Sequence, residues 1–73
     1  MTNLESVKVI FSFKYDDRVE LALDGGRKIT IDPKKADLFF YNTIQTGNVL
    51  DVEFGKKDTP KSIFWNNRKV YPI

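Results

Sequence analysis

Apolar and polar residues alternate along the first half of the chain, from Val7 to Ile31. Alternation with a period of two residues is typical of antiparallel strands that bury one face. The stretch therefore predicts a three-stranded meander, and its inward positions are Val7, Val9, Phe11, Phe13, Tyr15, Val19, Leu21, Leu23, Ile29 and Ile31.

The parity of this alternation also predicts the two turns. A two-residue turn at Asp16-Asp17 would place the apolar residues of the first two strands on opposite faces, whereas a three-residue loop over 16–18 keeps them together. The same test selects a three-residue loop over 24–26, with Gly26 at the position that needs a positive φ. The pairs implied are Tyr15 with Val19, Phe13 with Leu21, Phe11 with Leu23, Leu21 with Ile29, and Val19 with Ile31.

A helix is expected after the meander. Asp32 and Pro33 form a start signal, with aspartate at the N-cap and proline at the first helical position. The segment 34–45 then carries apolar residues at helical spacing, and Gly47 is a suitable stop. We expect a helix of about ten residues whose buried stripe is Ala36, Phe39, Phe40, Thr43 and Ile44, with Leu38 and Tyr41 facing elsewhere.

The remainder of the chain predicts further strands. Residues 49–54 alternate again, and a polar loop over 55–60 follows them. A last hairpin is expected to join 62–65 to 68–71 across an Asn-Asn turn, because asparagine tolerates positive φ. Its expected pairs are Trp65 with Arg68 and Ile63 with Val70, while Phe64, Lys69 and Tyr71 face the other way.

These elements predict a β-rich α+β fold with about five or six antiparallel strands and one short helix after the third strand. A small half-open barrel is the form we favour, because a short chain gains by curling its edges closed. We expect one domain over residues 1–73, with 1–6 as a flexible lead-in, and a chain that begins and ends as an independent reading frame.

Composition narrows the function classes. The chain has no histidine and no cysteine, so the commonest general base, metal ligand and thiol nucleophile are absent. Its acidic pairs fit a turn and a solvent-facing strand, and no glycine-rich phosphate motif occurs. We therefore expect no enzyme, no cofactor and no metal site. The sequence also contains no signal peptide and no run long enough to span a membrane, which predicts a cytoplasmic protein.

Two binding functions remain open. A small β-barrel can bind single-stranded nucleic acid by stacking bases on aromatic residues beside basic ones, as Trp65 with Arg68 would do. Alternatively, Arg68 lies over the Trp65 ring as a structural cation–π contact. The net charge of +2 is weak for phosphate binding and favours this structural contact over nucleic-acid binding.

Protein binding is supported by apolar residues that a small core cannot all enclose. They are Ile10, Leu38, Tyr41, Val49, Phe64 and Ile73. A second route is strand addition at an open edge, either on the strand beginning near Ser6 or on the last strand.

The chain resembles, in format, the small phage-encoded regulators that bind bacterial RNA polymerase. The features that resemble them are a 73-residue independent frame, β-rich patterning and the lack of His, Cys and any catalytic constellation. There is also a similarity to a family of short prokaryotic domains of unknown function, in DGGRKITID, the pair Phe39-Phe40, and VEFG followed by IFWNN. Neither resemblance assigns a role to a particular residue.

The sequence thus predicts a monomeric, non-catalytic regulator that occupies a surface of a larger host protein, with RNA polymerase as the leading candidate. Such a module would act sterically, in transcription regulation during a host–virus interaction in the bacterial cytoplasm. The alternative is a single-stranded nucleic-acid binder. The predicted partner-binding residues are Trp65, Arg68, Lys69 and Tyr71, followed by Lys8 and Ile10.

Overall fold

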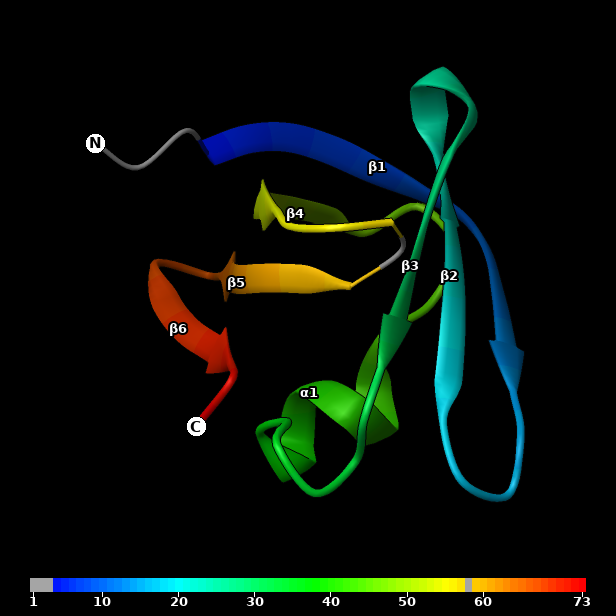
Figure 1. Ribbon diagram of the computed structural model, residues 1–73, viewed down its shortest axis with the longest axis vertical. Helices are drawn as coiled ribbons and strands as arrows, with labels where there is room; N and C mark the ends of the chain where they lie inside the picture. The colour runs from blue at the N-terminus through cyan, green and yellow to red at the C-terminus, as the bar shows by residue number, and fades with distance from the viewer. Residues whose placement is uncertain (1–3, 58) are drawn as a thin grey trace.

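The computed structural model, which describes residues 4–57 and 59–73, contains a six-stranded antiparallel sheet that curls into a half-barrel (Figure 1). The order of strands across the sheet is β3-β2-β1-β4-β5-β6. One short helix follows the third strand, and the predicted fold class is confirmed. The elements are β1 (Leu4–Lys14), β2 (Val19–Leu23), the 3-10 turn η1 (Asp24–Gly26), β3 (Arg27–Ile31), α1 (Leu38–Thr43), β4 (Val49–Phe54), β5 (Pro60–Trp65) and β6 (Arg68–Tyr71).

The long strand β1 joins the two halves of the sheet. Its first part, Leu4–Lys8, pairs with β4, and its second part pairs with β2 from Val9 onward. The strand bends between these parts, and the register with β2 shifts at Ile10, an extra residue that has no partner in the ladder. A bulge of this kind bends a strand and changes the face to which the following side chains point. The expected lead-in over 1–6 is wrong for residues 4–6, which belong to β1, and residues 1–3 lie outside the described chain.

The bulge overturns the predicted pairing of the first hairpin. Phe11 pairs with Ala22 and Phe13 with Glu20, so the loop between the strands has four residues, 15–18, instead of three. Val7 and Val9 are buried as expected. Phe11, Phe13 and Tyr15 are exposed, and the prediction that they face the core is wrong. Ser12 and Lys14 take the inward register positions, opposite the buried residues Leu21 and Val19.

The other two hairpins agree more closely with the sequence. Leu21 pairs with Ile29 and Val19 with Ile31, and Gly26 has a φ of 77°, all as predicted. In the last hairpin, Trp65 pairs with Arg68 across two asparagines with positive φ. The register then shifts, so that Ile63 pairs with Tyr71 and not with Val70 as predicted.

The helix begins later than the sequence suggests. Asp32 forms a turn, in which its carboxylate accepts a hydrogen bond from the Lys34 N–H at 2.9 Å. Asp37 is the true N-cap, because its carboxylate accepts from the Phe40 N–H at 3.0 Å. Both uses of aspartate follow from the same short acceptor side chain, so the start signal at Asp32 marks a turn and the prediction that the helix begins there is wrong. Within the predicted stripe, Ala36, Phe40 and Ile44 are buried, whereas Phe39 and Thr43 are exposed.

The segment between β3 and α1 protects the far edge of the sheet. The Asp37 N–H donates to the Val70 carbonyl at 2.8 Å, and the Ile73 N–H donates to the Lys35 carbonyl at 2.8 Å. The outer edge of β6 is therefore partly occupied, which argues against the last strand as the site of strand addition. Among the described residues, no helix is long and apolar enough to cross a bilayer.

The core lies between the curved sheet and α1. Phe40 is its largest fully buried side chain, and it packs with the inward residues of the strands. Those residues include Leu21, Ile29, Ile31, Leu50, Val52, Ile63 and Val70. No buried side-chain nitrogen or oxygen among the described residues lacks a hydrogen-bond partner, so the interior is apolar and satisfied.

Candidate functional site

The second half of β1 presents a row of exposed apolar side chains. Ile10, Phe11, Phe13 and Tyr15 form this row, here called the β1 ridge, and each is between 44% and 55% exposed. The Phe11 and Phe13 rings stack with their centroids 4.6 Å apart. Exposed apolar residues scattered over a surface are ordinary, but three on β1 and Tyr15 directly after it form a patch of the kind that partners bind.

Tyr15, at the end of the ridge, is fixed in place by Arg18. The Arg18 guanidinium lies 4.2 Å from the centre of the Tyr15 ring, and it is held there by Asp17 at 2.8 Å and Glu20 at 3.3 Å. The hydrogen bonds that the Arg18 guanidinium donates to Glu20 and Asp17 raise the pKa of Arg18 above its usual value. The cation therefore serves to orient Tyr15 and the turn and leaves the exposed ring edge available.

The backbone of this part of β1 has an open side. The Tyr15 N–H donates to the Arg18 carbonyl at 2.8 Å, which makes these two residues a hydrogen-bonded pair of the ladder. Such pairs alternate along an antiparallel strand, so Phe11 and Phe13 direct their backbone groups to β2. Ser12 and Lys14 then direct theirs to the opposite side.

No strand occupies that opposite side beyond Val9, in the part of the chain that the structure describes. The ladder with β4 ends at Lys8, and Val9 completes it by bonding to residues 47 and 48 of the preceding loop. In Figure 1 the end of β1 forms the margin of the sheet, with β2 on its inner side. The stretch from Ile10 to Lys14, here called the β1 edge, thus combines unpaired backbone groups with the apolar side chains of the ridge.

The last hairpin holds four of the predicted partner-binding residues, and the structure places them in different environments. Tyr71 is only 5% exposed, so the prediction that it faces away from the core is wrong. The cause is the register shift in β6, which turns Val70 and Tyr71 both inward. Lys69 is exposed, and Trp65 is partly buried against the core.

Trp65 and Arg68 do not make the cation–π contact considered from the sequence. Arg68 instead pairs with Asp37, with 3.0 Å between its Nη2 and a carboxylate oxygen. Trp65 contacts two aromatic residues of the helix: Phe40, whose ring is tilted at a centroid distance of 5.5 Å, and Phe39, which stacks at 6.1 Å. Phe39 and the neighbouring Leu38 are 61% and 72% exposed, so this platform is a second apolar surface.

Lys8 and Ile10, the remaining predicted site residues, both lie on β1 and are exposed. They flank the point where the strand bends. Ile10 is the bulged residue and belongs to the ridge. Lys8 pairs with Val49, and its backbone N–H donates to the Asp24 carboxylate at 3.1 Å. Ile10 is therefore part of the β1 edge and Lys8 lies just before it, whereas the last hairpin lies elsewhere in the sheet.

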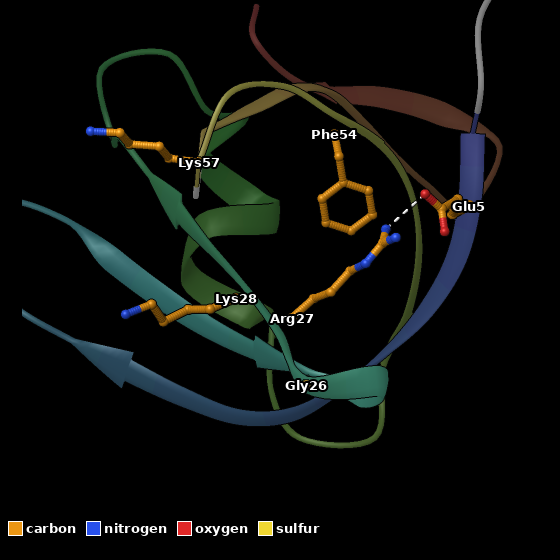
Figure 2. A pocket seen from close by; sticks show the side chains of 6 residues that line it. All are labelled: Glu5, Gly26, Arg27, Lys28, Phe54 and Lys57. Atoms are coloured by element: carbon orange, nitrogen blue, oxygen red, sulfur yellow. Dashed lines mark hydrogen bonds and ion pairs between the residues drawn. The ribbon is translucent and has the colours of Figure 1, made fainter.

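An open depression of about 600 Å³ lies at the other end of β1, where Gly26, Lys28 and Lys57 line it (Figure 2). Across it, Arg27 lies 4.3 Å from the centre of the Phe54 ring and bonds to the Glu5 carboxylate at 2.7 Å. Figure 2 shows that Lys28 and Lys57 extend away from Arg27. Because the guanidinium is already neutralised and the cations do not converge, the depression is not built to hold an anion.

The described residues contain no group of three or more acidic side chains placed to hold a metal ion. Partial burial raises the pKa of the Tyr41 hydroxyl, and the negative charges of Asp17 and Asp32 add to this effect. Tyr41 packs against the core, so the shift reflects its packing and does not mark a reactive group.

The β1 ridge was not found from the sequence, although one signal indicated it. Ile10 and Phe11 are adjacent apolar residues and interrupt an otherwise strict alternation. Such a break indicates a possible bulge, beyond which the exposed and buried faces exchange.

Comparison of the chain with family models, with curated proteins and with solved structures gave no significant match.

Proposed function

We propose that the chain is a non-catalytic protein-binding module that captures an extended segment of a larger protein along the β1 edge. The observation that carries this proposal is the coincidence of two features on one strand. Ser12 and Lys14 offer backbone hydrogen-bonding groups, and Phe11 and Phe13 offer apolar contacts on the adjoining face. Strand addition uses these two features together, since the backbone supplies affinity and the side chains supply selectivity.

The chemistry of the partner follows from the ridge. A strand lying antiparallel to β1 places its residues directly beside Phe11 and Phe13 on the outer face of the sheet. Aromatic or β-branched residues at those positions would each add about 0.2–1 kcal/mol relative to alanine. The partner is therefore an extended segment with large apolar residues at alternate positions.

The format of the chain suggests bacterial RNA polymerase as the partner, with action in the cytoplasm of a phage host. In this proposal the module acts by occupancy, since a bound domain blocks a surface that another factor uses.

The test is binding of the purified chain to purified bacterial RNA polymerase. The variant Phe11→Ser/Phe13→Ser removes the ridge, and Leu38→Ser/Phe39→Ser removes a comparable exposed surface on the helix. We expect the ridge variant to bind at least about tenfold more weakly, which corresponds to 1.4 kcal/mol, and the helix variant to bind as the wild type does. Equal binding by the wild type and the ridge variant would exclude the β1 edge, and failure of the wild type to bind would exclude this polymerase.

Single-stranded nucleic acid is the second candidate, and one observation favours it. The stacked pair of Phe39 and Trp65 is an aromatic platform, with Lys69 on the same hairpin. Against it, Arg68 is paired with Asp37 and contributes little net charge there. A nucleic-acid function requires oligonucleotide binding that falls steeply with salt and is lost in Phe39→Ala.

A further inference from the structure

We infer that the part of β1 after Val9 has two registers on β2, and that a one-residue slip between them exposes or withdraws the β1 ridge. In the observed register, here called ridge-out, Phe11 and Phe13 lie on the outer face. In the second register, here called ridge-in, both rings turn to the inner face. The inference rests on the proposed function, because it describes a regulation of that same site.

The slip has a fixed starting point at Val9. The Val9 N–H donates to the Asn48 carbonyl, and the Val9 carbonyl accepts from the Gly47 N–H, each at 2.8 Å. One residue earlier, the Lys8 N–H donates to the Asp24 carboxylate at 3.1 Å. Hydrogen bonds therefore hold this part of β1 from both sides, and only the residues that follow it can change register.

The bulge at Ile10 produces the ridge-out register. Because Ile10 is an extra residue, Ser12 lies opposite Leu21 and Lys14 lies opposite Val19. A ladder without the extra residue would be displaced by one position, which turns every following side chain to the other face. The buried residues of β2 would then face aromatic rings in place of a serine and a lysine.

The ridge-in register improves the pairs on the inner face of the sheet. Phe11 would lie opposite Leu21 and Phe13 opposite Val19, and aromatic–aliphatic pairs of this kind stabilise a sheet. The two side chains that now hold these inner positions are half-buried and exposed, respectively, so solvent reaches this side of β1 and larger rings can be accommodated there. Ridge-in therefore gains apolar burial that ridge-out lacks.

Arg18 stabilises the ridge-out register. The Tyr15 N–H donates to the Arg18 carbonyl at 2.8 Å, and the Arg18 guanidinium lies 4.2 Å from the centre of the Tyr15 ring. After the slip, Tyr15 would lie in the turn and Arg18 would lie opposite Lys14. Like charges directly opposite each other destabilise a pair of strands. Each register thus pairs one face of the sheet well and the other face less well, which is the condition for two states of similar free energy.

The two registers control access to the proposed binding site. Ridge-out presents Phe11 and Phe13 beside the open backbone groups of Ser12 and Lys14, whereas ridge-in withdraws both rings from that surface. A partner that contacts the rings binds only ridge-out, so its binding shifts the population toward this register. Because ridge-out is the observed register, ridge-in is the minor state of the free protein, on the order of a few per cent.

The first experiment traps each register with a disulfide. The chain contains no cysteine, so an introduced pair reports one contact. Phe13 lies opposite Glu20, so Phe13→Cys/Glu20→Cys links the ridge-out register. After the slip, Ser12 would lie opposite Glu20, so Ser12→Cys/Glu20→Cys links only ridge-in. Both are hydrogen-bonded pairs of their ladders, with α-carbons about 5.5 Å apart, within the range that a disulfide spans.

We expect both cysteine pairs to link when oxidised glutathione is added, the ridge-in pair more slowly because its register is the minor one. The mass of the monomer and its protection from thiol alkylation measure the linkage. In ridge-out, the side chains of residues 12 and 20 lie on opposite faces and cannot meet. Ser12→Cys/Asn67→Cys is the control, because Asn67 lies in the last hairpin, beyond β4 in the sheet, and it should not link within one chain.

The second experiment changes the balance between the registers. Arg18→Glu removes the cation from Tyr15 and, after the slip, places an unlike charge opposite Lys14. Linking of the ridge-in pair should become faster by roughly threefold to tenfold. Arg68→Glu is the matched control, since Arg68 is an exposed arginine that pairs with an acid elsewhere, and it should leave the rate unchanged. Should Arg18→Glu fail to fold, Arg18→Ala makes the same test with a smaller increase.

Deletion of Ile10 is the opposite change. Phe11 then follows Val9 directly and faces outward without a bulge, so the chain no longer has the residue on which the slip depends. Linking of the ridge-in pair should be lost, while the ridge-out pair still links and so shows that the deletion variant folds. A ridge-in pair that links no faster than the Asn67 control, or at a rate that neither Arg18→Glu nor the deletion changes, overturns the inference.

These outcomes are distinct from those of the proposed function. A ridge-in pair that never links, together with partner binding that depends on Phe11 and Phe13, would overturn the two registers and leave the function standing. Linking of both pairs as expected, together with partner binding that ignores the ridge, would overturn the proposed site and leave the two registers standing.

Discussion

Phe11 pairs with Ala22 in the β1–β2 ladder, one residue away from the Leu23 that a regular alternation assigns to it. The shift arises at Ile10 and reverses the faces of the rest of β1. Three aromatic residues that look like core in the sequence become surface for this reason, and the strand that carries them acquires both a patch and an open edge.

The exposed position of Phe13 can be tested by stability. We expect Phe13→Ser to lower the free energy of unfolding by less than about 1 kcal/mol, because the ring is 44% exposed. Leu21→Ala, at a fully buried residue that the sequence paired with Phe13, should cost about 2–5 kcal/mol. Urea unfolding at neutral pH measures both, and equal losses would contradict the shifted register.

Phe39 and Phe40 provide a matched pair on the helix. Phe40 is fully buried and Phe39 is 61% exposed, although the sequence places both in one stripe. Phe40→Ala should cost about 3–5 kcal/mol, and Phe39→Ala should stay within about 1 kcal/mol of the wild type. Should Phe40→Ala fail to fold, Phe40→Leu gives the same ranking at smaller cost. A more damaging Phe39 variant would refute the assignment.

Asp37 has two roles that substitutions can separate. Asp37→Ala removes the N-cap and the ion pair with Arg68, and it should cost about 0.5–2 kcal/mol for the cap alone. Asp37→Asn keeps a capping oxygen and loses only the exposed ion pair, at about 0.2–1 kcal/mol. Asp32→Ala is the comparison, because the Asp32 carboxylate accepts a hydrogen bond from the Lys34 N–H within a turn and caps no helix. A larger drop in the denaturation midpoint for Asp32→Ala than for Asp37→Ala would restore the start site expected from the sequence.

The turn of the last hairpin depends on left-handed backbone at Asn67, whose φ is 64°. Asn67→Gly should keep or slightly raise the thermal midpoint, because glycine adopts this conformation freely. Asn67→Val should lower the free energy of unfolding by about 1–2 kcal/mol. Circular dichroism melts of the two variants decide the point, and an unaffected valine variant would argue against the observed turn.

Alkaline stability should depend on Tyr41. Burial first, and then Asp17 and Asp32, raise its pKa in the folded state above the value of 10.0 for a free side chain. The folded protein therefore holds the proton more tightly than the unfolded chain. The resulting stability is fully present below pH 10 and is lost as the pH rises through the folded-state pKa. Tyr41→Phe should flatten the decline of the urea midpoint in this range, and a decline as steep as that of the wild type would contradict it.

Local chemistry determined much of this fold. The glycines of η1 and the asparagines before β6 set two turns whose backbone few other residues adopt, and alternation set the strands between them. The bounds of β4 and the pairing of β2 with β3 were predicted correctly, because both depend only on residues that are close together in the sequence. The half-barrel with one helix after its third strand follows from these elements in order.

Tertiary structure decided the features that bear on binding. β1 has to pair with β4 at one end and with β2 at the other, and the bulge at Ile10 accommodates both. Asp37 begins the helix and not Asp32, because residues 35–37 are held along β6 and Ile73 by backbone hydrogen bonds. Alternation specifies which residues share a face, but only the packing of the whole sheet specifies which face is covered, and this is why the β1 ridge lies on the surface.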